Sequence, residues 1–146
     1  MSPIRKLYQS ELRRIRKQGI KVSSSRGFFN TMCKVRGYPG SGYYEPPNII
    51  HIQPSIKTIS YRLRILLHEE GHWRDNKGGH QFLREFRAEK YLIQRAIELN
   101  NKLLTRQIVD IIAHWLELKN HKDFHVYYCA ASKLVKTKLW DKLCQN

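Results

Sequence analysis

The stretch Leu66-Leu67-His68-Glu69-Glu70-Gly71-His72-Trp73 contains the pattern His-Glu-x-x-His. Residues four apart lie on the same face of a helix, so His68 and His72 can both offer an imidazole nitrogen to one metal ion. Glu69 lies beside them, where its carboxylate is placed to hold a metal-bound water and to accept its proton as a general base. The spacing therefore predicts a helix that carries two metal ligands and one catalytic carboxylate.

Two neighbours of the motif indicate that this helix is buried. Leu66 and Leu67 come directly before the first histidine, so the incoming side of the helix is apolar. Gly71 lies inside the helix, where a glycine costs about 1 kcal/mol relative to alanine. A glycine in such a position usually serves close packing or access to a site. We therefore expect the two imidazoles to lie away from the open surface.

A catalytic zinc site has three protein ligands and one open position, so a third ligand has to come from elsewhere in the chain. A second helix is predicted over residues 81–99, and at 100° per residue Glu85 and Glu89 border its apolar face. Buried carboxylates are costly unless a cation neutralises them. His80, just before that helix, is another candidate ligand. The pattern predicts a Zn²⁺ cofactor and leaves the third ligand open among these three residues.

This part of the chain resembles the gluzincin zinc metallopeptidases, in particular the small minigluzincin or ImmA/IrrE-like kind. The resemblance covers roughly residues 43–96 and rests on the His-Glu-x-x-His motif and on the segment 85–89, which is similar to the family's Glu-x-x-Ala-Asp/Asn segment. It implies a zinc metalloendopeptidase in which His68, His72 and Glu85 bind zinc and Glu69 is the base. Glu89 would orient one of the ligating histidines.

A weaker similarity, to SprT and WLM-like peptidases, rests on His80 and implies that this histidine is the third ligand or assists at the oxyanion. Tyr43 and Tyr44 are further candidates for the oxyanion or for substrate contacts. The gluzincin resemblance also implies that the strand predicted over residues 48–53 is the edge strand on which an extended peptide aligns.

The rest of the sequence predicts an α+β fold with a small, mostly antiparallel sheet of about three strands. The β-prone runs IKV, MCKV and IIHI, the last at residues 49–52, are separated by turn-forming clusters of serine, proline and glycine. We expect this sheet to pack on the motif helix and on the glutamate-bearing helix. Helices are predicted over residues 10–18, from near 55 or 58 to 74, and over 81–99, 102–118 and 124–143.

The length of 146 residues predicts a single metallopeptidase-like domain. Within it we distinguish a basic N-terminal helix (1–20), a zinc-site core (43–96) and C-terminal helices (102–146). The spacing of neighbouring apolar residues predicts where two aromatic side chains lie. Trp115 has helical spacing among aliphatic residues and is assigned to the core, whereas His51 alternates with isoleucines and should face the opposite side of its strand.

The formal net charge of +15 is concentrated near the start of the chain. Residues 1–40 carry +9, whereas residues 41–120, which include the motif, carry only +3. Clustered cations favour phosphate binding; the candidate nucleic-acid contacts are Arg13, Arg14, Arg16 and Lys17. The alternative to a peptidase with a narrow protein substrate is therefore a basic nucleic-acid-associated protein, either a DNA-bound peptidase or a module with a structural or vestigial metal site.

The sequence has no apolar run near the roughly 20 residues that a membrane-spanning helix needs. It begins without an apolar stretch typical of a signal peptide, and its three cysteines are too few and too scattered for a disulfide framework. We therefore expect a cytoplasmic protein that acts on a protein or peptide and not at a membrane.

Overall fold

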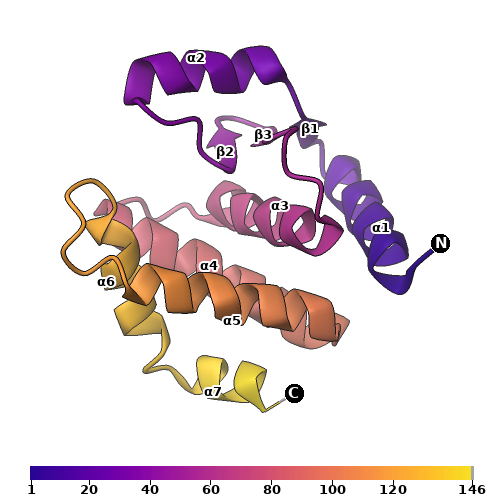
Figure 1. The fold of residues 1–146 in the computed structure, drawn as a ribbon. Coiled ribbons are helices and arrows are strands. Elements are labelled where there is room, and N and C mark those ends of the chain that lie inside the picture. The colour runs from indigo at the N-terminus through magenta and orange to yellow at the C-terminus, as the bar shows by residue number, and fades with distance from the viewer. Residues whose placement is uncertain (146) are drawn as a thin grey trace.

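The computed structural model describes residues 1–145, which form helices around a small sheet (Figure 1). The elements are α1 (Pro3–Lys17), β1 (Lys21–Ser23), α2 (Arg26–Arg36), β2 (Gly42–Glu45), β3 (Ile49–Ile52), α3 (Ile59–Arg74), α4 (Gln81–Leu99), α5 (Lys102–Leu116), α6 (His125–Leu134) and α7 (Lys138–Cys144). The predicted α+β class is confirmed. The motif helix α3 and the glutamate-bearing helix α4 have the predicted bounds.

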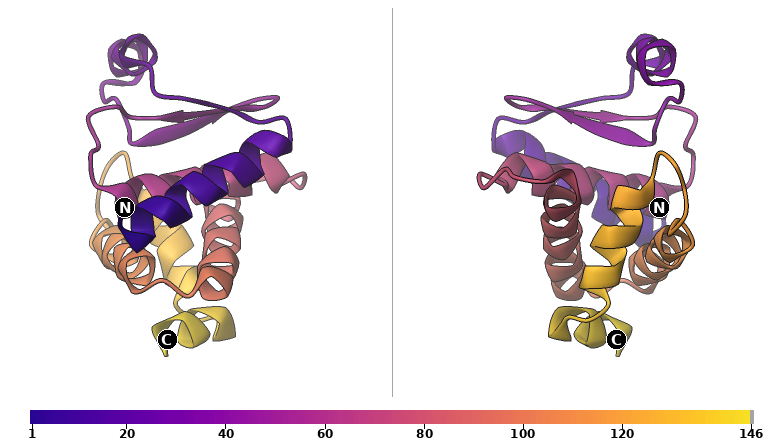
Figure 2. Two further views of the ribbon diagram at one scale, coloured as in Figure 1. Left: turned by 90° about the vertical axis from the view of Figure 1, so that its right-hand side faces the viewer. Right: turned by 90° about the vertical axis from the view of Figure 1, so that its left-hand side faces the viewer.

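Helix α3 lies in the middle of the molecule (Figures 1 and 2). The sheet covers one side of it, α4 and α5 lie on the other, and α1 runs along its flank. Leu63, Leu66 and Leu67 are consequently fully buried. The motif therefore lies on a buried helix, as its flanking leucines predicted.

The sheet is mixed, so the prediction of a mostly antiparallel sheet is wrong in part. The strand order is β1-β3-β2, with β2 antiparallel and β1 parallel to β3. Helix α2 and the reversing strand β2 lie between β1 and β3 in the chain and supply the long connection that a parallel pair requires. The central strand is therefore β3, and the edge strand beside the motif is β2, which corrects the assignment of the edge to residues 48–53.

The predicted strand at MCKV does not form, because these residues belong to α2. Both ends of this helix are capped. The side chain of Ser25 accepts a hydrogen bond from the Phe28 N–H at 3.3 Å, and Gly37 ends the helix with a left-handed conformation (φ 84°). The two caps outweigh the β preference of a short run that contains a single β-branched residue.

Two other helix boundaries differ from the prediction. Helix α1 begins at Pro3 instead of residue 10, because Ser2 caps it and proline suits the first helical position. The helix predicted over 124–143 is split into α6 and α7 by a new cap, in which Thr137 Oγ1 accepts from the Trp140 N–H at 3.1 Å. Within residues 1–145, no helix has the length and apolarity needed to cross a bilayer.

The two faces of β3 have different neighbours. Ile50 and Ile52 are fully buried in the core, and α3 packs against the sheet on this side. His51 points to the opposite face, as predicted, where its ring stacks on Phe28 of α2 with centroids 3.6 Å apart. The sheet is therefore enclosed between α3 and α2, and the prediction that it also packs on the glutamate-bearing helix is wrong, because α4 lies on the opposite side of α3.

Two glycines allow α3 to approach its neighbours closely. A Cβ atom at Gly71 would lie 2.8 Å from the carbonyl oxygen and 2.9 Å from the Cα of Ala88, so α3 and α4 are nearly in backbone contact there. A Cβ atom at Gly42 would collide with Ile65 and lie 3.5 Å from Cγ of Glu69. These contacts hold α4 and the edge strand β2 directly against the motif.

Candidate metal centre and active site

Three side chains from α3 and α4 converge on one point. His68, His72 and Glu85 each offer one ligand atom, and these atoms all lie within 4.8 Å of one another. The two Nε2 atoms of the histidines are 3.2 Å apart, and the carboxylate oxygens of Glu85 lie 2.7 Å from Nε2 of His72 and 3.4 Å from that of His68. Within residues 1–145 this is the one group of three or more such side chains that could hold a metal ion.

The donor set fits a zinc ion. Two imidazole nitrogens and one carboxylate form a common protein ligand set for catalytic zinc, which leaves a fourth position for water or substrate. Ligands at tetrahedral zinc distances lie about 3.3–3.5 Å from one another, close to two of the three separations here. The third, between His72 and Glu85, is shorter because these two side chains contact each other directly.

The structure brings Glu85, and neither of the other two candidates, to the pair of histidines. Glu89 lies on the far side of His68, with a carboxylate oxygen 2.6 Å from Nδ1. His80 is the N-cap of α4, where its Nδ1 accepts from the Phe82 N–H at 3.3 Å, and its side chain is exposed. Glu89 thus has the orienting position that the family resemblance implied, and His80 has the role of a capped turn residue.

Behind the histidines, Glu89 is held by a buried arginine. Arg64 is 5% exposed and forms an ion pair with Glu89, which is fully buried. Burial raises the pKa of Glu89, but Arg64 and His68 outweigh it and hold the pKa below its ordinary value. The carboxylate therefore stays ionised, and as an acceptor at Nδ1 it fixes the ring of His68 so that Nε2 faces the cluster.

The cluster has an excess of negative charge that favours a cation. Burial lowers the pKa of His68, but Glu85 and Glu89 outweigh this and raise the pKa above the usual range. Burial raises the pKa of Glu85, while the two histidines lower it well below its usual range. The carboxylates thus attract positive charge to this point, as a proton or as a metal ion.

Glu69 lies beside the cluster without being part of it. It is 8% exposed and lines cavities on both sides of the cluster. Burial raises the pKa of Glu69, and the neighbouring charge of Glu85 acts in the same direction, while His68 and His72 oppose them. A carboxylate with a raised pKa, next to a metal site and facing a cavity, is suited to accept a proton.

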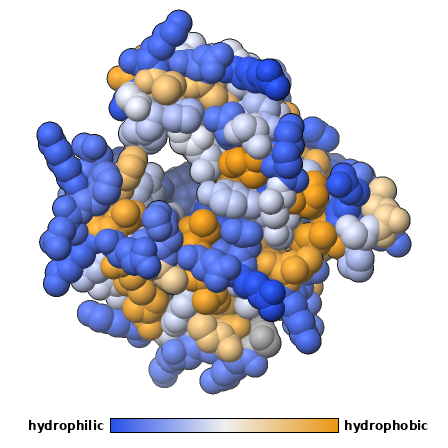
Figure 3. Space-filling model, viewed as in Figure 1, coloured by the Kyte–Doolittle hydropathy of each residue, from blue (hydrophilic) through white to orange (hydrophobic). Residues whose placement is uncertain are grey.

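Two cavities open on either side of the cluster, and Figure 3 shows the molecule hollowed between the part that contains α2 and the sheet and the helices below it. The first, of about 270 Å³, is rich in aromatic side chains; these are Tyr38, Tyr61, Trp115, Phe124 and Tyr127. The second, of about 580 Å³, is more polar and includes Tyr43, Tyr44 and His72. Glu69 and Glu85 line both cavities, so the cluster lies between them.

The two tyrosines of β2 line the second cavity, as expected for residues that contact substrate. The hydroxyl of Tyr44 donates to the carbonyl oxygen of Pro47 at 3.0 Å, and the ring of Tyr43 packs against Phe28 with centroids 5.7 Å apart. Both side chains thus stabilise the turn and the sheet. They form part of the wall of this cavity, and the hydroxyl proton of Tyr44 is already donated to Pro47.

Sequence reasoning missed most of the residues that line the cavities, among them Trp115, Tyr127 and Arg36. Trp115 packs against the core, as predicted, but it is only partly buried and also lines the first cavity, with its ring centroid 6.2 Å from that of His68. Tyr127 lines both cavities; burial, together with the charges of Glu85 and Glu69, raises its pKa and keeps its hydroxyl protonated. Arg36, at the end of α2, also lines both. No local spacing links these residues to the motif.

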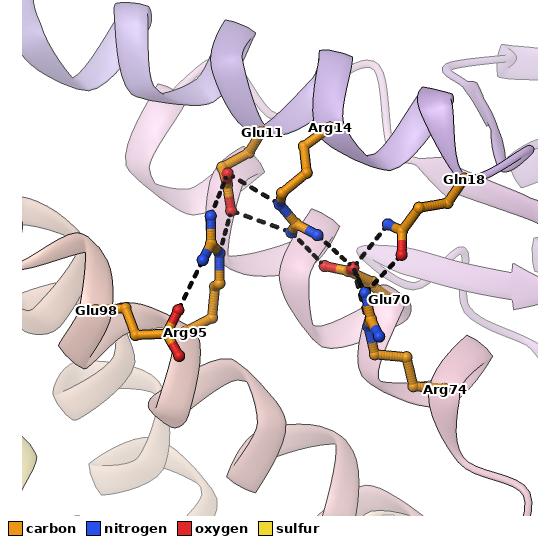
Figure 4. A network of polar contacts seen from close by, with 7 residues as sticks. All are labelled: Glu11, Arg14, Gln18, Glu70, Arg74, Arg95 and Glu98. Carbon is orange, nitrogen blue, oxygen red and sulfur yellow. Dashed lines mark hydrogen bonds and ion pairs between the residues drawn. The ribbon is translucent and has the colours of Figure 1, made fainter.

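The basic N-terminal helix is joined to the back of the motif helix by an ion network (Figure 4). Arg14 donates to both carboxylate oxygens of Glu70, at 2.8 and 2.6 Å, and also to Glu11. Glu70 is fully buried and is also bound by Arg74 and Gln18.

The same network corrects the interpretation of Arg14 as a free phosphate contact. Its guanidinium is already occupied by two carboxylates, Glu11 and Glu70. The other three candidates on α1, namely Arg13, Arg16 and Lys17, are exposed.

Comparisons of the chain with protein-family models, with curated proteins and with solved structures give no match.

Proposed function

We propose that this protein is a zinc-dependent metallopeptidase, in which His68, His72 and Glu85 hold the ion and Glu69 is the general base. The observation that carries the proposal is the convergence of these three ligands within 4.8 Å of one another, with Glu69 beside them in the wall of both cavities. A surface cluster of acidic residues would not combine this burial with an orienting carboxylate at the far nitrogen of His68.

A bound zinc ion supplies Lewis-acid chemistry, because it polarises a carbonyl group and lowers the pKa of a water toward neutrality. The protein's own residues move the proton. The carboxylate of Glu69 accepts it from the attacking water and then returns it to the leaving amine nitrogen. Tyr127, protonated and facing both cavities, is placed to donate a hydrogen bond to the carbonyl oxygen as negative charge develops there.

The edge strand β2 supports an extended peptide as substrate. One side of β2 pairs with β3, and Gly42 at its start lines both cavities. A peptide that adds to the free edge of such a strand gains backbone hydrogen bonds and passes the catalytic group in extended form. The lack of a side chain at Gly42 lets this strand lie directly against the motif helix, beside Glu69.

The proposal is tested by metal analysis together with Glu69→Gln. The purified wild type should contain about one zinc per chain and should cleave a mixed peptide library, with the cleavage sites identified by mass spectrometry. Glu69→Gln should retain the zinc and lose cleavage, because it removes the proton acceptor and leaves all three ligands in place. Glu117→Gln is the matched control, since its side chain is 78% exposed, and it should behave as the wild type. A wild type that binds no metal, or a Glu69→Gln protein that still cleaves, contradicts the proposal.

Nucleic-acid binding through α1 is the alternative, and it rests on the exposed side chains of Arg13, Arg16 and Lys17. Three phosphate contacts would give a slope of about −2.7 in a plot of log affinity against log salt concentration for duplex DNA. Affinity for random duplex DNA that is nearly independent of salt would exclude this alternative.

A further inference from the structure

Six arginines of the described residues are buried or half-buried, and Arg36 differs from the other five in its hydrogen bonds and ion pairs. Four of the other five are paired with carboxylates; they are Arg14, Arg64, Arg87 and Arg95. The fifth, Arg62, donates to three oxygen atoms. Arg36 makes one hydrogen bond, to the carbonyl oxygen of Pro39 at 3.3 Å, and within residues 1–145 its buried Nε has no partner.

The guanidinium of Arg36 is nevertheless held in one place. It lies 4.8 Å from the ring centroid of Tyr38 and 5.6 Å from that of Tyr43, so two aromatic rings bracket the cation. The Pro39 carbonyl holds one of its terminal nitrogens. The planar group is therefore positioned before any ligand arrives, and it keeps most of its donors free for an anion.

Its location connects this free cation with the candidate active site. Arg36 is one of five residues that line both cavities, together with Gly42, Glu69, Glu85 and Tyr127. No ion pair joins Arg36 to a carboxylate of the described residues, although Glu69 and Glu85 line both cavities with it and Asp75 lines the second. An anionic group of a bound molecule can therefore reach the guanidinium without displacing an internal partner.

We propose that Arg36 binds a carboxylate of the peptide substrate, either the C-terminal carboxylate or an acidic side chain close to the scissile bond. This inference rests on the proposed peptidase function for the identity of the ligand as a peptide. A planar guanidinium with free donors binds a carboxylate through two parallel hydrogen bonds. The adjoining aromatic cavity of about 270 Å³ lies just below the range of roughly 300–1,000 Å³ that holds whole small ligands, and it suits one large apolar side chain of the same peptide.

The test measures peptide binding in a Glu69→Gln background with zinc present, so that no cleavage occurs. The first pair of probes is acetyl-Ala-Ala-Phe with a free carboxylate and the same peptide as an amide. The second pair is acetyl-Ala-Asp-Phe-amide and acetyl-Ala-Asn-Phe-amide. Calorimetry gives the affinities, and tryptophan fluorescence provides a second signal because Trp115 lines the aromatic cavity. The pair that shows a difference tells which source of carboxylate the site takes.

With Arg36 present, the carboxylate member of at least one pair should bind roughly tenfold to a hundredfold more tightly than its neutral partner. Arg36→Gln should abolish this preference. Arg36→Lys keeps the charge but not the two-pronged geometry, so it should lose most of the preference while the aromatic contacts to a cation persist. Arg84→Gln is the matched control, because it removes the same charge from an exposed position on the second cavity, and it should keep the preference.

Equal binding within both pairs, failure of all four peptides to bind at millimolar concentration, or an equal effect of Arg84→Gln would overturn the inference. These results are separate from those that decide the proposed function. If the wild type cleaves peptides but shows no carboxylate preference, the proposed peptidase function is supported and the proposed role of Arg36 is wrong. If the protein prefers the carboxylate peptide through Arg36 but the wild type never cleaves a peptide, the carboxylate site is supported and the proposed peptidase function is wrong.

Discussion

Replacement of Gly71 by alanine places a methyl group between α3 and α4, directly against the backbone of Ala88. The added carbon would lie 2.8 Å from the carbonyl oxygen, so the helices must separate by 0.2 Å to reach 3.0 Å and by 0.6 Å to reach ordinary contact at 3.4 Å. Overpacking of this kind costs about 1–3 kcal/mol, and the better helix propensity of alanine recovers about 1 kcal/mol. We expect the free energy of unfolding to fall by up to about 2 kcal/mol in net terms.

The same displacement should weaken zinc binding. Two of the candidate ligands are on α3 and the third, Glu85, is on α4, three residues before Ala88. Metal sites tolerate ligand displacements of about 0.2 Å. A separation of 0.2–0.6 Å should therefore lower zinc affinity about tenfold or more, as loss of an orienting partner does.

Urea unfolding of the metal-free protein and zinc competition with a chromophoric chelator measure the two effects. Adding Ala88→Gly should not rescue Gly71→Ala, because the obstructing atoms are backbone atoms that glycine also has. Gly27→Ala on α2 is the control; its Cβ would lie at an ordinary 3.6 Å from Ser25 Oγ, so neither stability nor zinc affinity should fall. A Gly71→Ala protein with unchanged stability and unchanged zinc affinity would refute this account of how α3 and α4 set the site.

Three further predictions follow from the buried ion pairs. Arg14→Ala should lower the free energy of unfolding by about 2–3 kcal/mol in urea titrations, because Glu70 stays buried with fewer partners. Glu89→Gln should lower zinc affinity about 10–100-fold in chelator competition, since it removes the charged acceptor at Nδ1 of His68; unchanged affinity would mean that Glu89 does not orient this ring. Burial raises the pKa of Glu11, but hydrogen bonds from two arginines outweigh it and leave the pKa below 4.5. A depressed folded-state pKa stabilises the protein above the unfolded-state value, and this contribution disappears as pH falls through the folded-state value. Thermal melts should therefore show a loss of stability below about pH 4.5, and a Glu11→Gln variant with the same acid profile would contradict the assignment.

The candidate site was predictable from the sequence to the extent that local helix geometry determines it. His68 and His72 meet because they are four residues apart on one helix, and Glu85 faces them because of its angle on the next helix. The choice of Glu85 over Glu89 could not be made from spacing, because both border the same apolar face. It depends on how α4 crosses α3 at Gly71, which is a property of the packed pair.

Other features depend on contacts between residues that are distant in sequence. Tyr127 and Arg36 reach the cavities only because α2 and α6 fold over opposite sides of the motif helix. Arg14 looked like a surface cation because its partner Glu70 is 56 positions away. The strand predicted at MCKV does not form for a local reason. Ser25 and Gly37, which cap the helix that contains MCKV, lie outside this four-residue run and were not part of the prediction.

The bonds between Glu11 and Arg95 also constrain the order in which the chain can fold during synthesis. The two residues are 84 positions apart, yet the guanidinium binds both oxygens of the carboxylate at 2.7 and 2.8 Å. At translation rates of about 5–20 residues per second, Glu11 would leave the ribosome roughly 4–17 seconds before its partner. The apolar side of α1 has no cover until α3 emerges, and Glu11 is bound by Arg14 of its own helix but lacks Arg95 until α4 is made. The first helix can thus dock on α3 as soon as α3 is made, whereas its ion pair with Arg95 is completed only when α4 emerges.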